Sequence, residues 1–348
     1  MATGTIVSII GTGITLLGFL LDNVPNSDAG KATLNFYIAN DGAGDPPLSD
    51  AGGDLPDVRL WDETIEFLGI KADPGSCEEG AVTCTVDVST EEAPTYTLFT
   101  ANNDAICIAW TSITFPGPGQ KYGWHPGNWA RWCDDYGNGA GAWYYAQTVV
   151  PGLEDARDEV YCAWLDADGD VETTGFQVHW PEFNRFEENP AEPNDISYYC
   201  DNDPPMNFRT DQDPSSVIYW PTKKGKRDLF TPQSKAEKKR GLERQASRIS
   251  KRFASSTDIV KSYWPKHSAA KLCDPNLHAA GKSFVSYEEK SFCYMPTKTL
   301  YPFCETVDSG ACFADGNNTV VVKGAANARM AIPDLSHVKN SVIWGPDA

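Results

Sequence analysis

The chain carries none of the short motifs that identify the common enzyme classes. It has no HExxH zinc-binding pair, no GxSxG nucleophile elbow and no phosphate-binding P-loop. The apolar stretch GTGITLLG near the N-terminus offers glycines, but no strand precedes it, so it does not predict nucleotide binding. Histidine is scarce, with 5 residues, and no two of them are spaced as i, i+4 on one helix face. We therefore expect that the protein is not an enzyme and has no resident cofactor.

Basic residues are also scarce, except in one window. Residues 1–222 hold 8 Lys or Arg against 36 Asp or Glu, whereas residues 223–252 hold 12 against 3. The acidic part should repel the phosphates of nucleic acids, so we expect no nucleic-acid partner. The changes in charge predict an acidic domain, a basic connector and a neutral domain.

An apolar segment long enough to cross a membrane comfortably is missing. The apolar residues 6–21 fall short of the roughly 20 that a spanning helix needs. Residues 1–31 instead predict a secretory signal or signal anchor, with a possible cleavage site at residues 27–29. A signal normally begins with basic residues, and this one does not. A retained buried helix and a segment that contacts membrane through residues 6–21 therefore remain alternatives.

Long amphipathic helices are absent from residues 32–220. Short segments rich in β-branched and aromatic residues, such as TLNFYIAN and AICIAWTSITF, alternate with turns of Gly, Pro, Asp and Asn. This pattern predicts a mainly β fold, with an antiparallel β-sandwich or jelly-roll-like domain. Residues 221–254 have no apolar period and predict a disordered linker. Residues 255–348 predict a small disulfide-rich α+β domain, in which SSTDIVKSYW indicates a short helix and TVVVKG a strand.

The 10 cysteines lack any CxxC or Cys/His spacing typical of zinc sites, so they indicate disulfides and a secreted, extracellular protein. Six precede the connector and four follow it. This division suits bridges closed within each half, although a bridge across the connector fits the count equally well. We expect Cys77–Cys84, because that loop is short, and favour Cys107–Cys133 and Cys162–Cys200. The pairing of the remaining four stays open (Cys273, Cys293, Cys304 and Cys312). Free thiols in an unprocessed intracellular structural protein are the alternative.

The basic connector contains three Lys-Arg pairs, each at the end of a basic cluster (Lys226-Arg227, Lys239-Arg240 and Lys251-Arg252). Processing proteases of the secretory pathway cut after such pairs where the chain is exposed and unstructured. The connector therefore predicts a precursor that is cut into two chains. An inert linker and a nuclear import signal are the alternatives, and the nuclear one conflicts with disulfide formation.

Two stretches and one sequon are candidate ligand or modification sites. KYGWHPGNWARWCDDYGNGAGAWYY sets aromatic rings beside carboxylates, a combination that binds sugars, although the favoured alternative is that these rings fill the core. Its candidate residues are Trp124, Trp129, Trp132, Asp134, Asp135 and Trp143. DADGDVETTGFQ alternates carboxylates that could bind Ca²⁺, but it departs from the EF-hand pattern and could be an ordinary hairpin loop. Its candidates are Asp166, Asp168, Asp170 and Glu172. The sequon at Asn317 predicts a glycoprotein.

The stretches APTYTLFTANNDAICIAWTSITF, YGWHPGNWARWC and KSFCYMPTKTLYPFC resemble segments of a group of uncharacterised secreted proteins from filamentous ascomycete fungi. That group supplies no catalytic residue. The order of apolar leader, domain, Lys-Arg connector and cysteine-rich domain is similar to fungal killer-toxin precursors, which kexin-type proteases process. The resemblance implies a toxin- or effector-like binding protein with a processing protease and a cell-surface or glycan target as partners. A calcium-assisted, lectin-like carbohydrate-binding protein remains an alternative.

Overall fold

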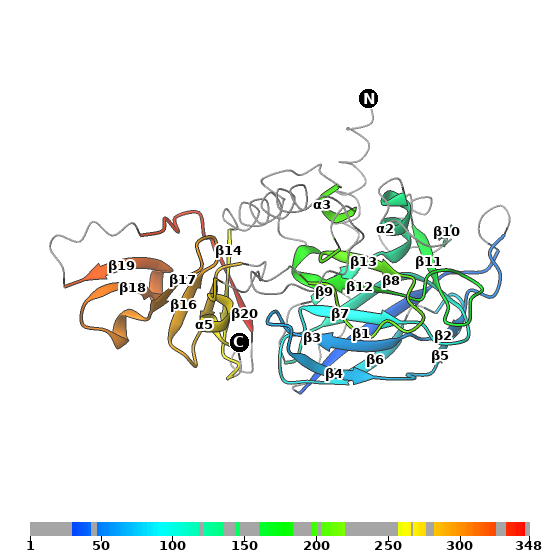
Figure 1. The fold of residues 1–348 in the computed structure, drawn as a ribbon, viewed down its shortest axis with the longest axis horizontal. Helices are drawn as coiled ribbons and strands as arrows, with labels where there is room; N and C mark the ends of the chain where they lie inside the picture. Colours follow the sequence, from blue (N-terminus) through cyan, green and yellow to red (C-terminus); the bar gives the residue numbers. More distant parts are fainter. Residues whose placement is uncertain are drawn as a thin grey trace, which may run out of the picture. The chain divides into compact units, whose positions relative to one another are not determined.

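The computed structural model describes residues 30–42, 47–81, 83–117, 121–134, 143–146, 160–183, 197–200, 203–219, 257–265, 267–275, 282–324 and 332–344. These residues form two compact units, one within 30–219 and one within 257–344 (Figure 1). The leader as far as residue 29 and the whole basic connector lie outside the described residues. None of the helices in the described ranges has the length and hydrophobicity that a membrane crossing requires.

The first unit is a sandwich of two antiparallel sheets, as the alternating sequence pattern predicts (Figure 1). One sheet has the order β10-β11-β8-β1-β6, with β9 beside β8. Its strands are β1 (Lys31–Ile38), β6 (Cys84–Ser89), β8 (Ile106–Thr114), β9 (Lys121–Trp124), β10 (Trp143–Tyr145) and β11 (Tyr161–Leu165). The other has the order β13-β12-β7-β3-β4, formed by β3 (Asp57–Trp61), β4 (Phe67–Lys71), β7 (Tyr96–Thr100), β12 (Gly175–His179) and β13 (Met206–Arg209). The short strands β2 (Gly53–Asp54) and β5 (Ser76–Cys77) form a separate pair.

Aromatic side chains fill the space between the two sheets. Phe36 on β1 meets Phe99 on β7 edge to face, with ring centroids 5.6 Å apart. Trp124 at the end of β9 packs on Phe176 of β12 at 4.9 Å. Rings of this size bury a large apolar area, and their edge-to-face contacts add to the stabilisation of the sandwich.

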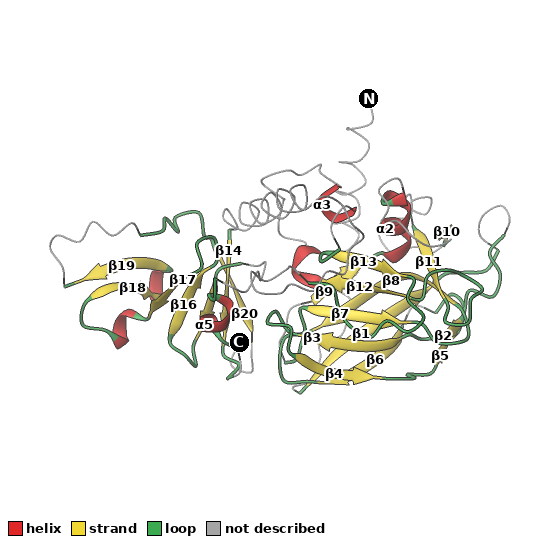
Figure 2. Cartoon of the chain, viewed as in Figure 1, coloured by secondary structure: helices red, strands yellow, loops and turns green. Residues whose placement is uncertain are grey.

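Short helices lie beside the sheets of the first unit (Figure 2). Helix α2 (Pro126–Trp132) begins with a proline, whose fixed φ and missing N–H suit the first helical turn. Its Gly127 lies against the backbone of Tyr161, where an added Cβ would come within 2.3 Å of the carbonyl oxygen. Only glycine therefore lets α2 pack so closely on β11. The other helical turns among the described residues of this unit are η3 (Trp180–Phe183) and α3 (Ser197–Cys200).

The second unit combines a five-stranded mixed sheet with a β-hairpin. The sheet order is β17-β16-β15-β14-β20, and β14 runs parallel to both β15 and β20. Its strands are β14 (Asp258–Ser262), β15 (Phe284–Ser286), β16 (Ser291–Tyr294), β17 (Thr299–Pro302) and β20 (Asn340–Trp344). The hairpin is β18 (Gly310–Ala314) and β19 (Thr319–Lys323), joined by η5 (Asp315–Asn317). Two further short elements are α5 (Ala269–Leu272) and η4 (Cys304–Thr306).

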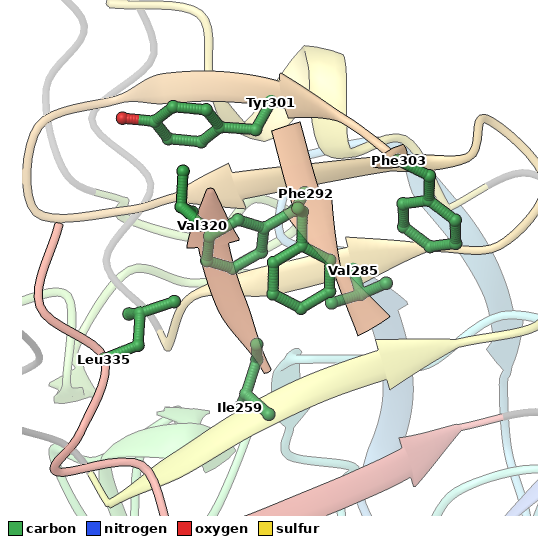
Figure 3. Packing of buried hydrophobic residues seen from close by; sticks show 8 residues of the cluster. Ile259, Val285, Phe292, Tyr301, Phe303, Val320 and Leu335 are labelled. Atoms are coloured by element: carbon green, nitrogen blue, oxygen red, sulfur yellow. The ribbon is translucent and has the colours of Figure 1, made fainter. Parts of the chain in front are cut away.

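One hydrophobic cluster joins the sheet of the second unit to its hairpin (Figure 3). Phe292 on β16 stacks on Phe313 of β18, with ring centroids 4.3 Å apart. The strand predicted for TVVVKG is confirmed as β19, but the helix predicted for SSTDIVKSYW is wrong. Its β-branched Ile259 and Val260 are buried in β14, where such side chains pack well.

All ten cysteines form disulfides, and each bridge closes within one unit. The predicted Cys77–Cys84 bond is confirmed. The favoured Cys107–Cys133 and Cys162–Cys200 bonds are wrong. The structure instead pairs Cys107–Cys162 and Cys133–Cys200, and the second unit pairs Cys273–Cys293 and Cys304–Cys312. The physical reason is that β11 lies next to β8, which brings their cysteines together although 55 residues separate them.

Candidate functional site

The aromatic stretch divides into a buried part and a surface part. Trp124 is fully buried in the sandwich, and Trp129 of α2 packs against Phe183 and Tyr199 at centroid distances of 5.4 and 4.8 Å. The core therefore uses the rings of these two tryptophans, which is the alternative that the sequence left open for this stretch. Trp132 and Trp143 are half-buried and Asp134 is exposed, while Asp135 lies outside the described residues.

The surface part contains what we call the arginine–aromatic patch, formed by Arg131, Trp143, Tyr145 and Tyr161. The exposed guanidinium of Arg131 lies 4.4 Å from the ring centroid of Tyr161 and 5.5 Å from that of Trp143. Trp143 and Tyr145 each meet Tyr161 edge to face, at 5.4 and 6.2 Å. The cation–π contacts hold a positive charge among half-exposed rings, which suits a ligand with hydroxyl or anionic groups.

The acidic loop after β11 is a turn that its own first residue stabilises. Asp166 is fully buried, and its carboxylate accepts hydrogen bonds from the backbone N–H groups of Asp168, Gly169 and Asp170, at 3.3, 2.8 and 2.6 Å. Burial raises the pKa of this carboxyl, but these N–H groups outweigh burial and lower it. Oxygens of the three aspartates lie within 4.8 Å of one another, whereas Glu172 is exposed and outside that group. The local hydrogen bonds explain Asp166 without a cation.

The sequence did not predict a buried charged cluster at one end of the sandwich. His179 is fully buried at the end of β12 and stacks on Tyr96, with ring centroids 4.1 Å apart. Its Nε2 lies 2.8 Å from Oε2 of Glu63, and its Nδ1 lies 3.4 Å from Oε1 of Glu182. Burial opposes protonation of His179, but the two carboxylates outweigh it and raise its pKa to about 9. The buried imidazolium therefore neutralises carboxylates and has no access to a substrate.

Two further histidines are buried and neutral. Burial lowers the pKa of His125 and of His267 to about 4 in each case, and the Ala109 carbonyl opposes this weakly for His125. Nδ1 of His267 lies 2.7 Å from Oγ of Ser262, a spacing that a serine nucleophile and its base would share. Ser262 is fully buried, however, and its Oγ also accepts a hydrogen bond from the Trp264 N–H. This pair is structural.

The six residues of the Lys-Arg pairs lie outside the described residues, and Asn317 is exposed in η5. No family model, curated protein or solved structure matches the chain.

Proposed function

We propose that the chain is a secreted precursor that a processing protease cuts at its Lys-Arg pairs into an acidic β-sandwich chain and a small disulfide-rich chain. The products act by binding a target, as a toxin or effector does, and not by catalysis. The observation that supports this proposal is the disulfide pattern, because all ten cysteines are paired and none of the bonds joins the two units.

The disulfide pattern bears on processing because each unit keeps its own cross-links and core when the connector is cut. The first unit has its interleaved aromatic core, and the second has the cluster around Phe292 and Phe313. Small domains rich in disulfides are typical of secreted proteins. An unprocessed intracellular structural protein would have no comparable use for five disulfides.

The arginine–aromatic patch supports a binding role for the sandwich chain. It offers rings for stacking and one positive charge in a domain where basic residues are rare. A carbohydrate with an acidic or hydroxyl-rich face fits that chemistry, and a lectin-like function is the second candidate. Nothing in the geometry of the patch requires calcium.

The processing proposal is tested by expressing the full chain in a eukaryotic host that secretes it through a Lys-Arg-specific protease. We expect two fragments that separate on a gel without reductant. Changing Arg227, Arg240 and Arg252 together to alanine should leave one continuous chain. In the matched control, alanine replaces Arg244 and Arg248, which lie in the same connector outside any Lys-Arg pair. This variant chain should still be cut. A wild-type chain that leaves the cell uncut would contradict the proposal.

A further inference from the structure

The turn of the second unit's hairpin exposes one asparagine, while residues near it form contacts with the sheet. Asn317 is the last residue of η5 and is exposed. It begins the sequence Asn317-Asn318-Thr319, which matches Asn-x-Ser/Thr and is the one such sequon in the chain. Asn318 has φ of +51°, a left-handed conformation that asparagine tolerates better than most residues, and it turns the chain into β19.

The residues beside Asn317 anchor this turn to the sheet. Oδ1 of Asp315 is 2.7 Å from Nζ of Lys261 on β14, and Oδ2 of Asp315 accepts a hydrogen bond from the Tyr287 hydroxyl at 2.9 Å. The side-chain amide of Asn318 donates to Ser341 on β20 at 3.5 Å. Since its neighbours face the sheet, a large group on Asn317 can extend into solvent without disturbing the packing.

The sequon threonine contacts the asparagine directly. The hydroxyl of Thr319 donates a hydrogen bond of 2.6 Å to Oδ1 of Asn317. This contact uses the carbonyl oxygen of the side chain and does not involve its nitrogen, Nδ2. Nδ2 is the atom that carries the sugar in an N-linked glycan.

We propose that Asn317 is N-glycosylated and that the glycan projects from the β18–β19 hairpin. The inference rests on the proposed function, because the modification requires passage through the secretory pathway. The sugar comes from a lipid-linked sugar diphosphate. A bond forms between Nδ2 of Asn317 and the anomeric carbon, and the bond from that carbon to the diphosphate oxygen breaks. Nδ2 loses one proton to a base of the transferring enzyme, and the lipid diphosphate leaves.

The test uses the full wild-type chain secreted from a eukaryotic host and treated with peptide N-glycosidase. We expect a loss of mass equal to one glycan and conversion of Asn317 to aspartate, read by peptide mass spectrometry. Asn317→Gln and Thr319→Ala should each secrete a chain without the glycan. The matched control Asn318→Gly keeps both the sequon and the left-handed turn, and it should remain glycosylated.

The outcomes separate this inference from the processing proposal. A secreted, cut chain whose Asn317 carries no sugar overturns the glycan and leaves processing intact. A glycosylated chain that stays continuous supports the glycan and contradicts processing. Because the decisive reading is made on the wild-type protein, poor folding of a variant does not affect it.

Discussion

Replacing His179 with glutamine should destabilise the sandwich, and the loss should depend on pH. The imidazole lies between Glu63 and Glu182 with no exposed surface, and its pKa is raised to about 9 from an ordinary value of 6.5. A group whose pKa is raised on folding stabilises the fold in its protonated form. Its contribution is complete below the unfolded pKa and is lost as pH rises through the folded one.

The pKa difference sets the size of the effect. One pKa unit corresponds to about 1.4 kcal/mol, so the shift from 6.5 to about 9 is worth about 3 kcal/mol of unfolding free energy. Glutamine would leave two carboxylates without a positive partner, and breaking a buried ion pair in this way costs about 3–5 kcal/mol. Well above the folded pKa, wild-type His179 is itself neutral, so the cost of the substitution should shrink by about 3 kcal/mol.

The assay is urea unfolding of the full chain, followed by tryptophan fluorescence, at one pH below 6.5 and at one pH well above 9. The matched control is His125→Gln, which removes another buried histidine of the same unit. Burial lowers the pKa of His125 to about 4, so below pH 6.5 the unfolded chain binds a proton at His125 that the folded chain does not. The cost of His125→Gln should therefore be larger at the higher pH, opposite to the trend expected for His179→Gln. If His179→Gln costs as much at the higher pH as it does below pH 6.5, the charged bridge between the two carboxylates does not exist.

Three further predictions concern stability. Lys282 and Asp258 form an ion pair of 2.7 Å in which the two side chains are only 6% and 3% exposed. Lys282→Met breaks this pair and should lower the unfolding free energy of the second unit by about 3–5 kcal/mol, measured by denaturant unfolding. Combining Lys282→Met with Asp258→Asn should recover much of the lost unfolding free energy, because no unpaired charge then stays buried. Asp166→Asn weakens three backbone hydrogen bonds and should cost about 1–3 kcal/mol, and a thermal shift assay should give the same loss with or without added calcium. Replacing Cys133 and Cys200 with alanine removes a disulfide that spans 67 residues and should lower the unfolding free energy by about 4 kcal/mol. Peptide mapping of the native protein should recover the Cys133–Cys200 bond and no Cys107–Cys133 bond.

Local pattern was enough to predict the fold class. The side chains of Leu34, Phe36 and Ile38 are buried along β1, as their alternation with polar residues predicts, although the intervening Thr33 and Asn35 are buried as well. The Cys77–Cys84 bond was predictable for a similar reason, since a short loop keeps its ends close. Both predictions depend on neighbours in the sequence.

Features that depend on which strands become neighbours were not predictable. Glu63 and His179 are 116 residues apart, and nothing near either one indicates the other. His179 and Glu182 are three residues apart, which offered a weak signal within VHWPEF. The aromatic stretch showed which rings are present but not which way they face, so the sequence left open whether Trp124 binds a ligand or fills the core, where it is buried.

Intact mass and N-terminal sequencing of the protein from its natural source decide whether one precursor is cut into two separable chains. We expect two species that separate without reductant, the smaller beginning at Phe253 after removal of the basic connector. One species with an unbroken chain through Arg227, Arg240 and Arg252 would contradict it.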